Sequence, residues 1–288
     1  MTAVPSLFSA LCDDASMSPP KRAKLPDALA DHLNHRGAAY SGLIGPLVVE
    51  GPRWPALTQA VSELAPGDPL QVAMTFPGGC AEAFGVLPEV QDDDRVALTA
   101  VEFADPMGRP APEFFEALSA LQIPQGVEIR VEIPRGVHHL EYVAGLTALG
   151  YTAKLHTGGP TARSFPADKD LAESILALVA SGVRFKASGG LLHGVRNTDP
   201  KTDVEQHGFL NLLVATHRAL EGAVAAPIAE ALATRDGETL VSELNGLTAA
   251  KAARLRATFR SFDTWSVDEP LDDLLTLGLM PSAVKPSA

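Results

Sequence analysis

Apolar and polar positions repeat along the chain in one order: an extended apolar run, a turn, and then an amphipathic helix. Runs of this kind predict strands at 41–50, 70–76, 96–103, 127–133, 151–156 and 183–188. Between them, apolar residues spaced three or four apart predict helices, as where Leu171, Ile175 and Leu178 share one face of 168–182. Strand starts recur at roughly 25 to 30 residues, the size of one strand–helix unit.

Alternating strands and helices form a parallel sheet covered by helices, which is either an open doubly wound sheet or a closed barrel. No G-x-G-x-x-G motif follows the first strand, which removes the best pointer to an open dinucleotide-binding sheet. Three successive strands instead carry polar side chains at every second position, as at Lys154 and His156 or at Lys186 and Ser188. Strands of a parallel sheet are usually apolar on both faces, so we expect these polar faces to line a barrel axis. The predicted fold is α/β, a TIM-type (β/α) barrel of seven or eight parallel strands with an N-terminal arm.

The domain boundaries follow from where this pattern begins and ends. Residues 1–36 are predicted to be an N-terminal arm, 37–280 the barrel domain and 281–288 a flexible C-terminal tail. After Ser188 a long polar loop precedes helices near 209–223, 226–236 and 249–259, and a last strand is expected at 258–266. Residues 238–244 are compatible with either a barrel strand or a helix.

Charge and composition narrow the classes of function. The formal net charge of -12 disfavours nucleic acid and anionic membranes as partners. No window approaches the roughly 18 uninterrupted apolar residues of a membrane span. Two cysteines, Cys12 and Cys80, are too few for a disulfide framework and fit a reducing cytoplasm. We therefore expect a cytoplasmic protein that binds a small molecule. The arm would reach a neighbouring copy, so a homodimer is a further expectation.

Candidate chemistry lies at the carboxyl ends of the predicted strands, which meet at one end of a barrel. The residues brought together there would be Glu102, Arg130, Glu132, Lys154, His156, Lys186 and Ser188. Charged groups are costly away from water unless they are paired or useful. A lysine crowded by other cations loses its proton more easily and becomes a nucleophile. Lys154 and Lys186 are thus candidates for a Schiff-base lysine and its partner, and spacing alone does not assign the roles.

The segments "AKLHTGG" and "KASGG" give these lysines a further context. Over about a third of the chain the sequence resembles the deoxyribose-phosphate aldolase-like class I aldolase barrels. The resemblance implies that Lys154 forms the imine, that Lys186 is the second lysine, and that Arg130 stands for a further basic residue. It also implies no cofactor.

Two departures accompany this resemblance. The last strand reads "SFDTWS" and places Asp263 where the family's phosphate-gripping turn would be. The family's catalytic aspartate has no clear counterpart, so Glu102 or Glu132 would serve, with His156 as a further proton carrier. An altered substrate is therefore expected.

Binding residues are expected around the same end of the barrel. Ser188, Gly189 and Gly190 could cradle an anion with backbone N–H groups. The polar loop adds His193, Arg196 and His207, with Arg196 offered to a substrate carboxylate.

Three functions follow from these residues. The leading one is a Schiff-base lyase, like a class I aldolase, acting on a small carbonyl compound that is neutral or anionic. The second is a non-catalytic or regulatory barrel, in which the polar axis holds a small anionic metabolite without turnover. Lys154 and Lys186 would alternatively only neutralise Glu102 and Glu132 in a buried ion network. The third is a metal-assisted barrel enzyme using His193, His207 and nearby carboxylates, although no tight ligand spacing supports a metal site. The substrate and the direction of reaction are not disclosed by the sequence.

Overall fold

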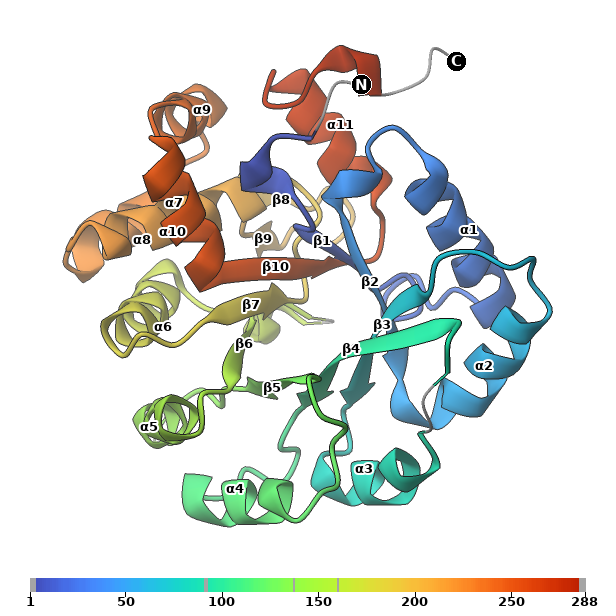
Figure 1. Ribbon diagram of the computed structural model, residues 1–288. Coiled ribbons are helices and arrows are strands. Elements are labelled where there is room, and N and C mark those ends of the chain that lie inside the picture. Colours follow the sequence, from blue (N-terminus) through green and yellow to red (C-terminus); the bar gives the residue numbers. More distant parts are fainter. Residues whose placement is uncertain (1–3, 91–92, 137, 160, 285–288) are drawn as a thin grey trace.

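Eight parallel strands close into a barrel, and helices surround it on the outside (Figure 1). This arrangement comes from a computed structural model, which describes residues 4–90, 93–136, 138–159 and 161–284. Around the barrel the strand order is β1, β10, β7, β6, β5, β4, β3 and β2, so each strand lies beside its neighbour in the sequence. The expected TIM-type barrel is confirmed, with eight strands.

The barrel strands are short, and a separate hairpin lies in the loop after β7. The strands are β1 Cys12–Asp14, β2 Ile44–Glu50, β3 Leu70–Phe76, β4 Val96–Phe103, β5 Glu128–Glu132, β6 Thr152–His156, β7 Phe185–Ser188 and β10 Phe259–Thr264, and the hairpin strands are β8 Asn197–Thr198 and β9 Glu205–Gln206. The first five expected strands after residue 40 overlap β2 to β6, and the sixth overlaps β7.

One helix follows each of the first six barrel strands, and four helices lie between β7 and β10. The helices are α1 Leu25–Gly37, α2 Trp54–Ser62, α3 Cys80–Val86, α4 Ala111–Ser119, α5 His139–Leu149, α6 Asp168–Ala180, α7 Phe209–Leu220, α8 Ala225–Ala233, α9 Gly237–Asn245, α10 Ala249–Thr258 and α11 Asp268–Thr276. No helix in the described part of the chain is both long and apolar enough to cross a membrane.

The expected N-terminal arm is wrong, and the open choice between strand and helix at 238–244 is resolved as a helix. Residues 1–36 are not an arm, because β1 pairs with β2 on one side and with β10 on the other, and α1 begins at Leu25. The segment offered as a route to a dimer is thus part of the barrel. Residues 238–244 belong to helix α9, which Asp236 caps by accepting hydrogen bonds from the backbone N–H groups of Glu238 and Thr239. Of the predicted tail, residues 285–288 lie outside the described residues.

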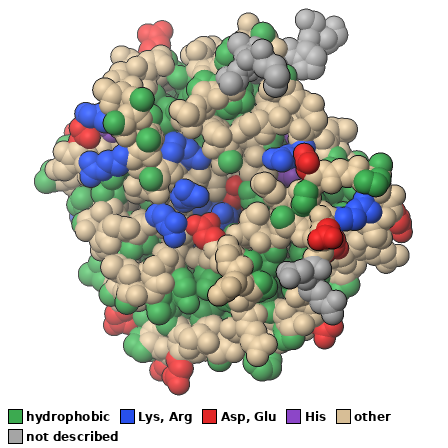
Figure 2. Space-filling model, in the orientation of Figure 1, with side chains coloured by type: hydrophobic (Ala, Val, Ile, Leu, Met, Phe, Trp, Pro, Cys, Tyr) green, Lys and Arg blue, Asp and Glu red, His purple; other side chains and the backbone are tan. Residues whose placement is uncertain are grey.

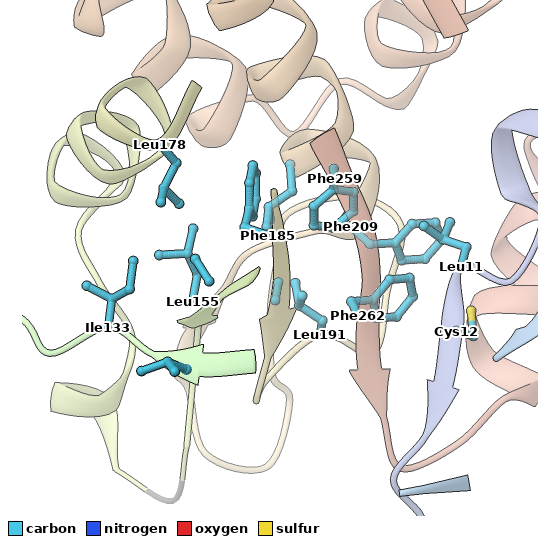
Figure 3. Packing of buried hydrophobic residues seen from close by; sticks show 14 of the residues in the cluster. Leu11, Cys12, Ile133, Leu155, Leu178, Phe185, Leu191, Phe209, Phe259 and Phe262 are labelled. Carbon is cyan, nitrogen blue, oxygen red and sulfur yellow. The ribbon is translucent and has the colours of Figure 1, made fainter. Parts of the chain in front are cut away.

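The main hydrophobic core lies between the strands and the outer helices. Phe185 on β7 contacts Phe259 on β10, with ring centroids 5.3 Å apart. Phe209 of α7 stacks on Phe262 of β10 at 4.8 Å. Figure 3 shows these rings side by side on the outer face of the strands. Because successive residues of a strand point to opposite faces, Lys186, which follows Phe185, and Asp263, which follows Phe262, face the barrel axis.

The inside of the barrel is divided into an apolar part and a polar part. Val48, Ala73 and Ala100 are register partners on β2, β3 and β4, and with Ala15 they form a small buried cluster separate from the main core. The axis-facing positions of β5, β6, β7 and β10 are mostly charged or hydroxylic. Small side chains on one side of the axis leave room for the long charged ones that reach across from the other.

Candidate functional site

A cluster of acidic and basic side chains lies buried on the barrel axis. Lys186 of β7 is at its centre, and its side chain is fully buried. Its Nζ donates hydrogen bonds to carboxylates from three other strands: Asp13 at 2.6 Å, Glu102 at 2.8 Å and Asp263 at 2.5 Å. Burying an ammonium is costly unless it is paired and fully hydrogen-bonded, and three carboxylate partners meet this requirement.

Lys154 of β6 belongs to the same cluster but lies nearer to solvent. Its Nζ donates to Oε2 of Glu102 at 2.8 Å and lies 3.8 Å from Oδ2 of Asp263. The Lys154 side chain is 11% exposed, whereas that of Lys186 is 0% exposed. The two lysines therefore meet at one carboxylate, and Lys154 is the more exposed of the two.

Arg130 of β5 completes the cluster on the side of the strand starts. Its Nη1 donates to Glu102 at 2.9 Å and to Asp13 at 3.2 Å, while its Nε donates to Glu128 at 2.8 Å. The hydroxyl of Ser261 donates to Asp13 at 2.9 Å. Three cations and four carboxylates are thus joined by direct contacts, and the cluster has no surplus positive charge.

Strand register brings these residues together. Lys154 is the register partner of Lys186 on one side and of Glu132 on the other, and Glu102 is the partner of Arg130. Strand alternation then places His156 and Ser188, again register partners, one layer further along the axis. The expected layers of polar side chains from neighbouring strands are therefore present.

The electrostatic environment of Lys154 differs from the one expected. Burial lowers the pKa of Lys154, but Glu102 and Asp263 raise it by more, and the result is a pKa above the ordinary value of 10.5. We expected neighbouring cations such as Lys186 and Arg130 to lower the pKa of Lys154. This expectation is wrong, because the carboxylates between the cations outweigh the repulsion. Asp13, Asp263 and Glu102 likewise raise the pKa of Lys186 against the effect of burial.

The carboxylates of the cluster differ in their affinity for protons. Burial raises the pKa of Glu102, but Lys154, Lys186 and Arg130 outweigh it and hold that pKa well below its ordinary value. Asp263 is different: burial and the neighbouring Glu102 and Asp13 keep its pKa raised in spite of the two lysines. Asp263 is therefore the member of the cluster best suited to accept a proton.

Glu132 and His156 lie together at the carboxyl ends of their strands, at the mouth of the barrel. His156 Nδ1 is 4.0 Å from Oε2 of Glu132, and both side chains are about a third exposed, at 38% and 32%. Burial lowers the pKa of His156 in spite of Glu132, so the ring is neutral near pH 7. A neutral imidazole at this place can accept a proton from a bound molecule.

Ser188, Gly189 and Gly190 follow β7 at the same mouth. Gly189 and Gly190 have φ angles of 79° and 69°, and a Cβ on Gly189 would lie 2.1 Å from the carbonyl oxygen of Gly158. Both positions therefore require glycine, which agrees with a role in turning the chain. The Ser188 hydroxyl is buried without a hydrogen-bond partner in the described structure. Because buried hydroxyls normally have a hydrogen-bond partner, this one is a candidate contact for a ligand.

The loop residues are bound to other parts of the loop and its surroundings. His193 Nδ1 pairs with Asp273 at 3.2 Å, and Arg196 pairs with Asp168 at 2.5 Å and with Glu205 at 3.2 Å. His207 contacts the carbonyl oxygen of Pro166 at 2.9 Å. Because two carboxylates already hold the Arg196 guanidinium, this structure does not offer it to a substrate.

The carboxylates with metal-ligand geometry are not those near the histidines. Among the described residues, the one group of three possible ligands within 4.8 Å of one another is Asp13, Glu102 and Asp263. All three already accept hydrogen bonds from Lys186, whose ammonium lies where a cation would lie. Neither His193 nor His207 joins such a group in the described part of the chain.

Sequence reasoning missed Asp13 and Ser261, and it missed that Asp263 accepts a hydrogen bond from Lys186. Asp13 lies in a strand of three residues, too short to show alternation, within the segment taken for an arm. The sequence did contain one signal of a buried carboxylate: two acids, Asp13 and Asp14, directly follow the apolar residues Leu11 and Cys12.

Comparison of the sequence with models of known protein families, and with curated proteins, finds no match.

Proposed function

We propose that this barrel is a lyase of the class I aldolase kind, in which Lys154 forms an imine with a small carbonyl compound. The observation that carries the proposal is the division between the two lysines. Both bond to Glu102, but Lys186 is enclosed by three carboxylates and Lys154 alone is partly exposed. The resemblance of "AKLHTGG" and "KASGG" to aldolase barrels supports the same assignment.

The first step needs Lys154 to lose a proton, and Asp263 is the acceptor that we propose. Its carboxylate lies 3.8 Å from the Lys154 ammonium and has a raised pKa. The neutral amine then adds to the carbonyl carbon and forms a carbinolamine, with a new C–N bond. Asp263 returns its proton to the carbinolamine hydroxyl, which leaves as water, and a protonated imine remains. The ligand would displace the ion pair between Lys154 and Glu102 as it enters.

Breaking or forming the C–C bond next to the imine requires a base, and His156 with Glu132 is the pair we propose. His156 is neutral near pH 7 and lies two residues beyond Lys154 on the same face of β6. In the cleavage direction the base takes the proton of the substrate hydroxyl as the C–C bond breaks. The electron pair moves into the iminium and gives an enamine, which is later protonated and hydrolysed from Lys154.

The charges of the site favour a reacting unit that is itself neutral. Each cation in the cluster is already compensated, so an anionic group gains little there. If the substrate carries an anionic group, the Ser188 hydroxyl at the mouth is the partner that we propose for it.

No cofactor enters these steps. Cys12 and Cys80 are both free and buried, which supports a reducing, cytosolic location for this activity.

One observation favours a second function, a barrel that binds a small metabolite without turnover. Lys154 has a raised pKa and donates a hydrogen bond to Glu102, so its amine is protonated and paired rather than free. In this alternative the cluster only orders the axis of the barrel.

Exchange of α-protons separates the two functions. An imine between Lys154 and acetaldehyde or acetone makes the α-protons of the carbonyl compound exchangeable, which proton NMR in D₂O records as loss of signal. We expect the wild-type protein to catalyse exchange, Lys154→Ala to lose it, and Lys169→Ala, a change at an exposed lysine of α6, to retain it. Equal rates in wild type and Lys154→Ala, or none above buffer across a panel of small aldehydes and ketones, would favour the binding protein.

A further inference from the structure

A cavity of about 810 Å³ opens at the end of the barrel where the strands begin, away from His156 and Ser188. Its wall includes residues that start or precede several strands, among them Gln71 of β3, Glu128 of β5 and Arg184 just before β7. The turn before β1 also contributes, through Ser9 and Ala10. Figures 1 and 2 view the molecule from this end, and Figure 2 shows Lys or Arg side chains gathered around the centre.

Three arginines in this wall have no carboxylate partner among the described residues. Arg260 makes no side-chain hydrogen bond or ion pair there, and Arg184 only approaches the carbonyl oxygen of Gly150 at 3.4 Å. Arg256 donates to backbone carbonyl oxygens, including those of Phe259 at 2.7 Å and Ser9 at 3.0 Å. These contacts position the guanidinium groups of Arg184 and Arg256 without a direct ion pair, and the nearest acids, Asp13 and Glu128, act on Arg256 and Arg260 only at longer range.

The carboxylates of the same wall are already used. Glu128 accepts from Arg130 at 2.8 Å and from the hydroxyl of Thr152 at 2.7 Å. Asp13 accepts from Lys186 and Arg130. The wall therefore carries more positive than negative charge, although Asp13 and Glu128 partly offset Arg256 and Arg260 at longer range, in a protein whose net charge is -12.

Keeping like charges together costs free energy, which a bound anion offsets. Burial and the neighbouring Arg260 lower the pKa of Arg256 to about 10, so the guanidinium is less stable here than in water but is charged at pH 7. A register shift between β10 and β7 lies at the same place, between Phe259 and Phe262. At this irregularity the consecutive residues Arg260 and Ser261 both line the cavity, which strict alternation along a strand would not allow.

We propose that this cavity binds a small phosphate-bearing anion, held by Arg184, Arg256 and Arg260. Guanidinium groups present paired N–H donors that match phosphate oxygens, and three of them suit a group with about two negative charges. The volume lies within the range of about 300 to 1,000 Å³ typical of small-molecule sites. Gln71, Thr99 and Ser261 supply hydrogen-bonding groups for the remainder of a phosphorylated metabolite.

The ligand proposed for this cavity is independent of the chemistry proposed at Lys154, but Asp13, Glu128 and Arg130 belong both to the cavity wall and to the charged cluster. Arg130 lines the cavity and also donates to Glu102, the carboxylate that both lysines share. The two ends of the barrel axis would thus hold different ligands, a carbonyl compound at the mouth and a phosphate at the strand starts.

Isothermal titration calorimetry with two probes tests this site. Inorganic phosphate and glycerol 3-phosphate are titrated into the full chain at constant ionic strength, with sodium chloride as the reference. We expect saturable one-to-one binding that Arg184→Gln/Arg260→Gln weakens about tenfold or more. Arg254→Gln, at an exposed arginine of α10 outside the cavity, should bind as the wild type does. Tighter binding of glycerol 3-phosphate would identify an organic phosphate as the ligand, and equal binding would identify free phosphate.

Three results would overturn the proposal. They are the absence of saturable binding, an unchanged affinity in Arg184→Gln/Arg260→Gln, and a loss of binding in Lys154→Ala, which would locate the anion at the mouth instead. Circular dichroism checks that each variant is folded, and the single variants Arg184→Gln and Arg260→Gln replace the double variant if it does not fold.

Discussion

Lys154 and Lys186 donate hydrogen bonds to the two different oxygens of a single carboxylate, Glu102, at the same distance of 2.8 Å. The two amines nevertheless differ in accessibility, because Lys186 is enclosed and Lys154 is partly exposed. Glu102 therefore links a lysine suited to order the cluster with one suited to meet a ligand. The proposed division of roles between the two lysines depends on this shared carboxylate.

Loss of the Glu102 charge should destabilise the fold strongly. Glu102→Gln leaves Lys154, Lys186 and Arg130 with one carboxylate fewer in a buried place. Removing one partner of a buried ionic network typically costs about 3 to 5 kcal/mol of the free energy of unfolding. Urea denaturation followed by circular dichroism measures the change. Glu113→Gln, on the exposed face of α4, is the matched control and should change stability by less than about 0.5 kcal/mol. A loss of similar size in both variants would contradict a special role for Glu102.

Acidic pH should lower the free energy of unfolding because Glu102 becomes protonated. The pKa of folded Glu102 is well below the ordinary 4.5, so its stabilising contribution is complete above that pH and is lost as the pH falls through the folded value. Asp14 and Glu128, whose pKa values are also lowered, act in the same direction, while the raised pKa of Asp263 acts against them. Unfolding free energies measured from pH 7 down to 3 should decline below about pH 4.5, and the decline should be shallower in Glu102→Gln. Parallel curves for the two proteins would show that Glu102 is not the cause.

Alkaline pH should lower the free energy of unfolding because Lys154 and Lys186 lose their protons. The pKa values of Lys154 and Lys186 are raised, so their contribution is complete below the ordinary 10.5 and is lost as the pH rises through the folded values. Burial also raises the pKa of Tyr142, which adds a decline of the same sign. The measurement is therefore made in a Tyr142→Phe background. Stability that stays constant there from pH 9 to 12 would contradict the ion pairing of the lysines.

The N-terminal segment should contribute to stability as a barrel strand does. Leu11 is fully buried, and its backbone N–H and carbonyl groups bond to Leu43 and Phe262 on either side. Leu11→Ala should lower the free energy of unfolding by about 2 to 5 kcal/mol, as truncation of a buried leucine does. Leu33→Ala, at a residue of α1 that is 38% exposed, should cost much less. If Leu11→Ala is as stable as the wild type in urea, the segment is not a strand of the barrel.

Much of the fold could be predicted from the sequence because its longer strands carry a clear pattern. β2, β3 and β4 have seven or eight residues each, and their apolar runs gave their positions directly. β1 has three residues, so neither alternation nor length distinguished it from a turn. Helix α9 was ambiguous because its apolar residues are few, and the cap by Asp236 is a contact that only the structure displays.

The candidate site could be predicted only in part, for reasons of electrostatics. Alternation along β6 and β7 correctly placed Lys154 and Lys186 on the same side of the sheet, and register then made them neighbours. Their pKa values depend on which carboxylates lie between them, and Asp13 and Asp263 come from the two ends of the chain. Spacing along the sequence carries no information on that convergence.

The most direct test of the central claim is to locate a trapped imine. The protein is incubated with small aldehydes and ketones in the presence of borohydride, which reduces an imine to a stable amine, and tryptic peptides are then sequenced by mass spectrometry. We predict one adduct per chain on Lys154, its loss in Lys154→Ala, and its retention in Lys169→Ala. An adduct confined to exposed lysines such as Lys169, or no adduct with any carbonyl compound of the panel, would contradict the assignment of Lys154 as the reactive amine.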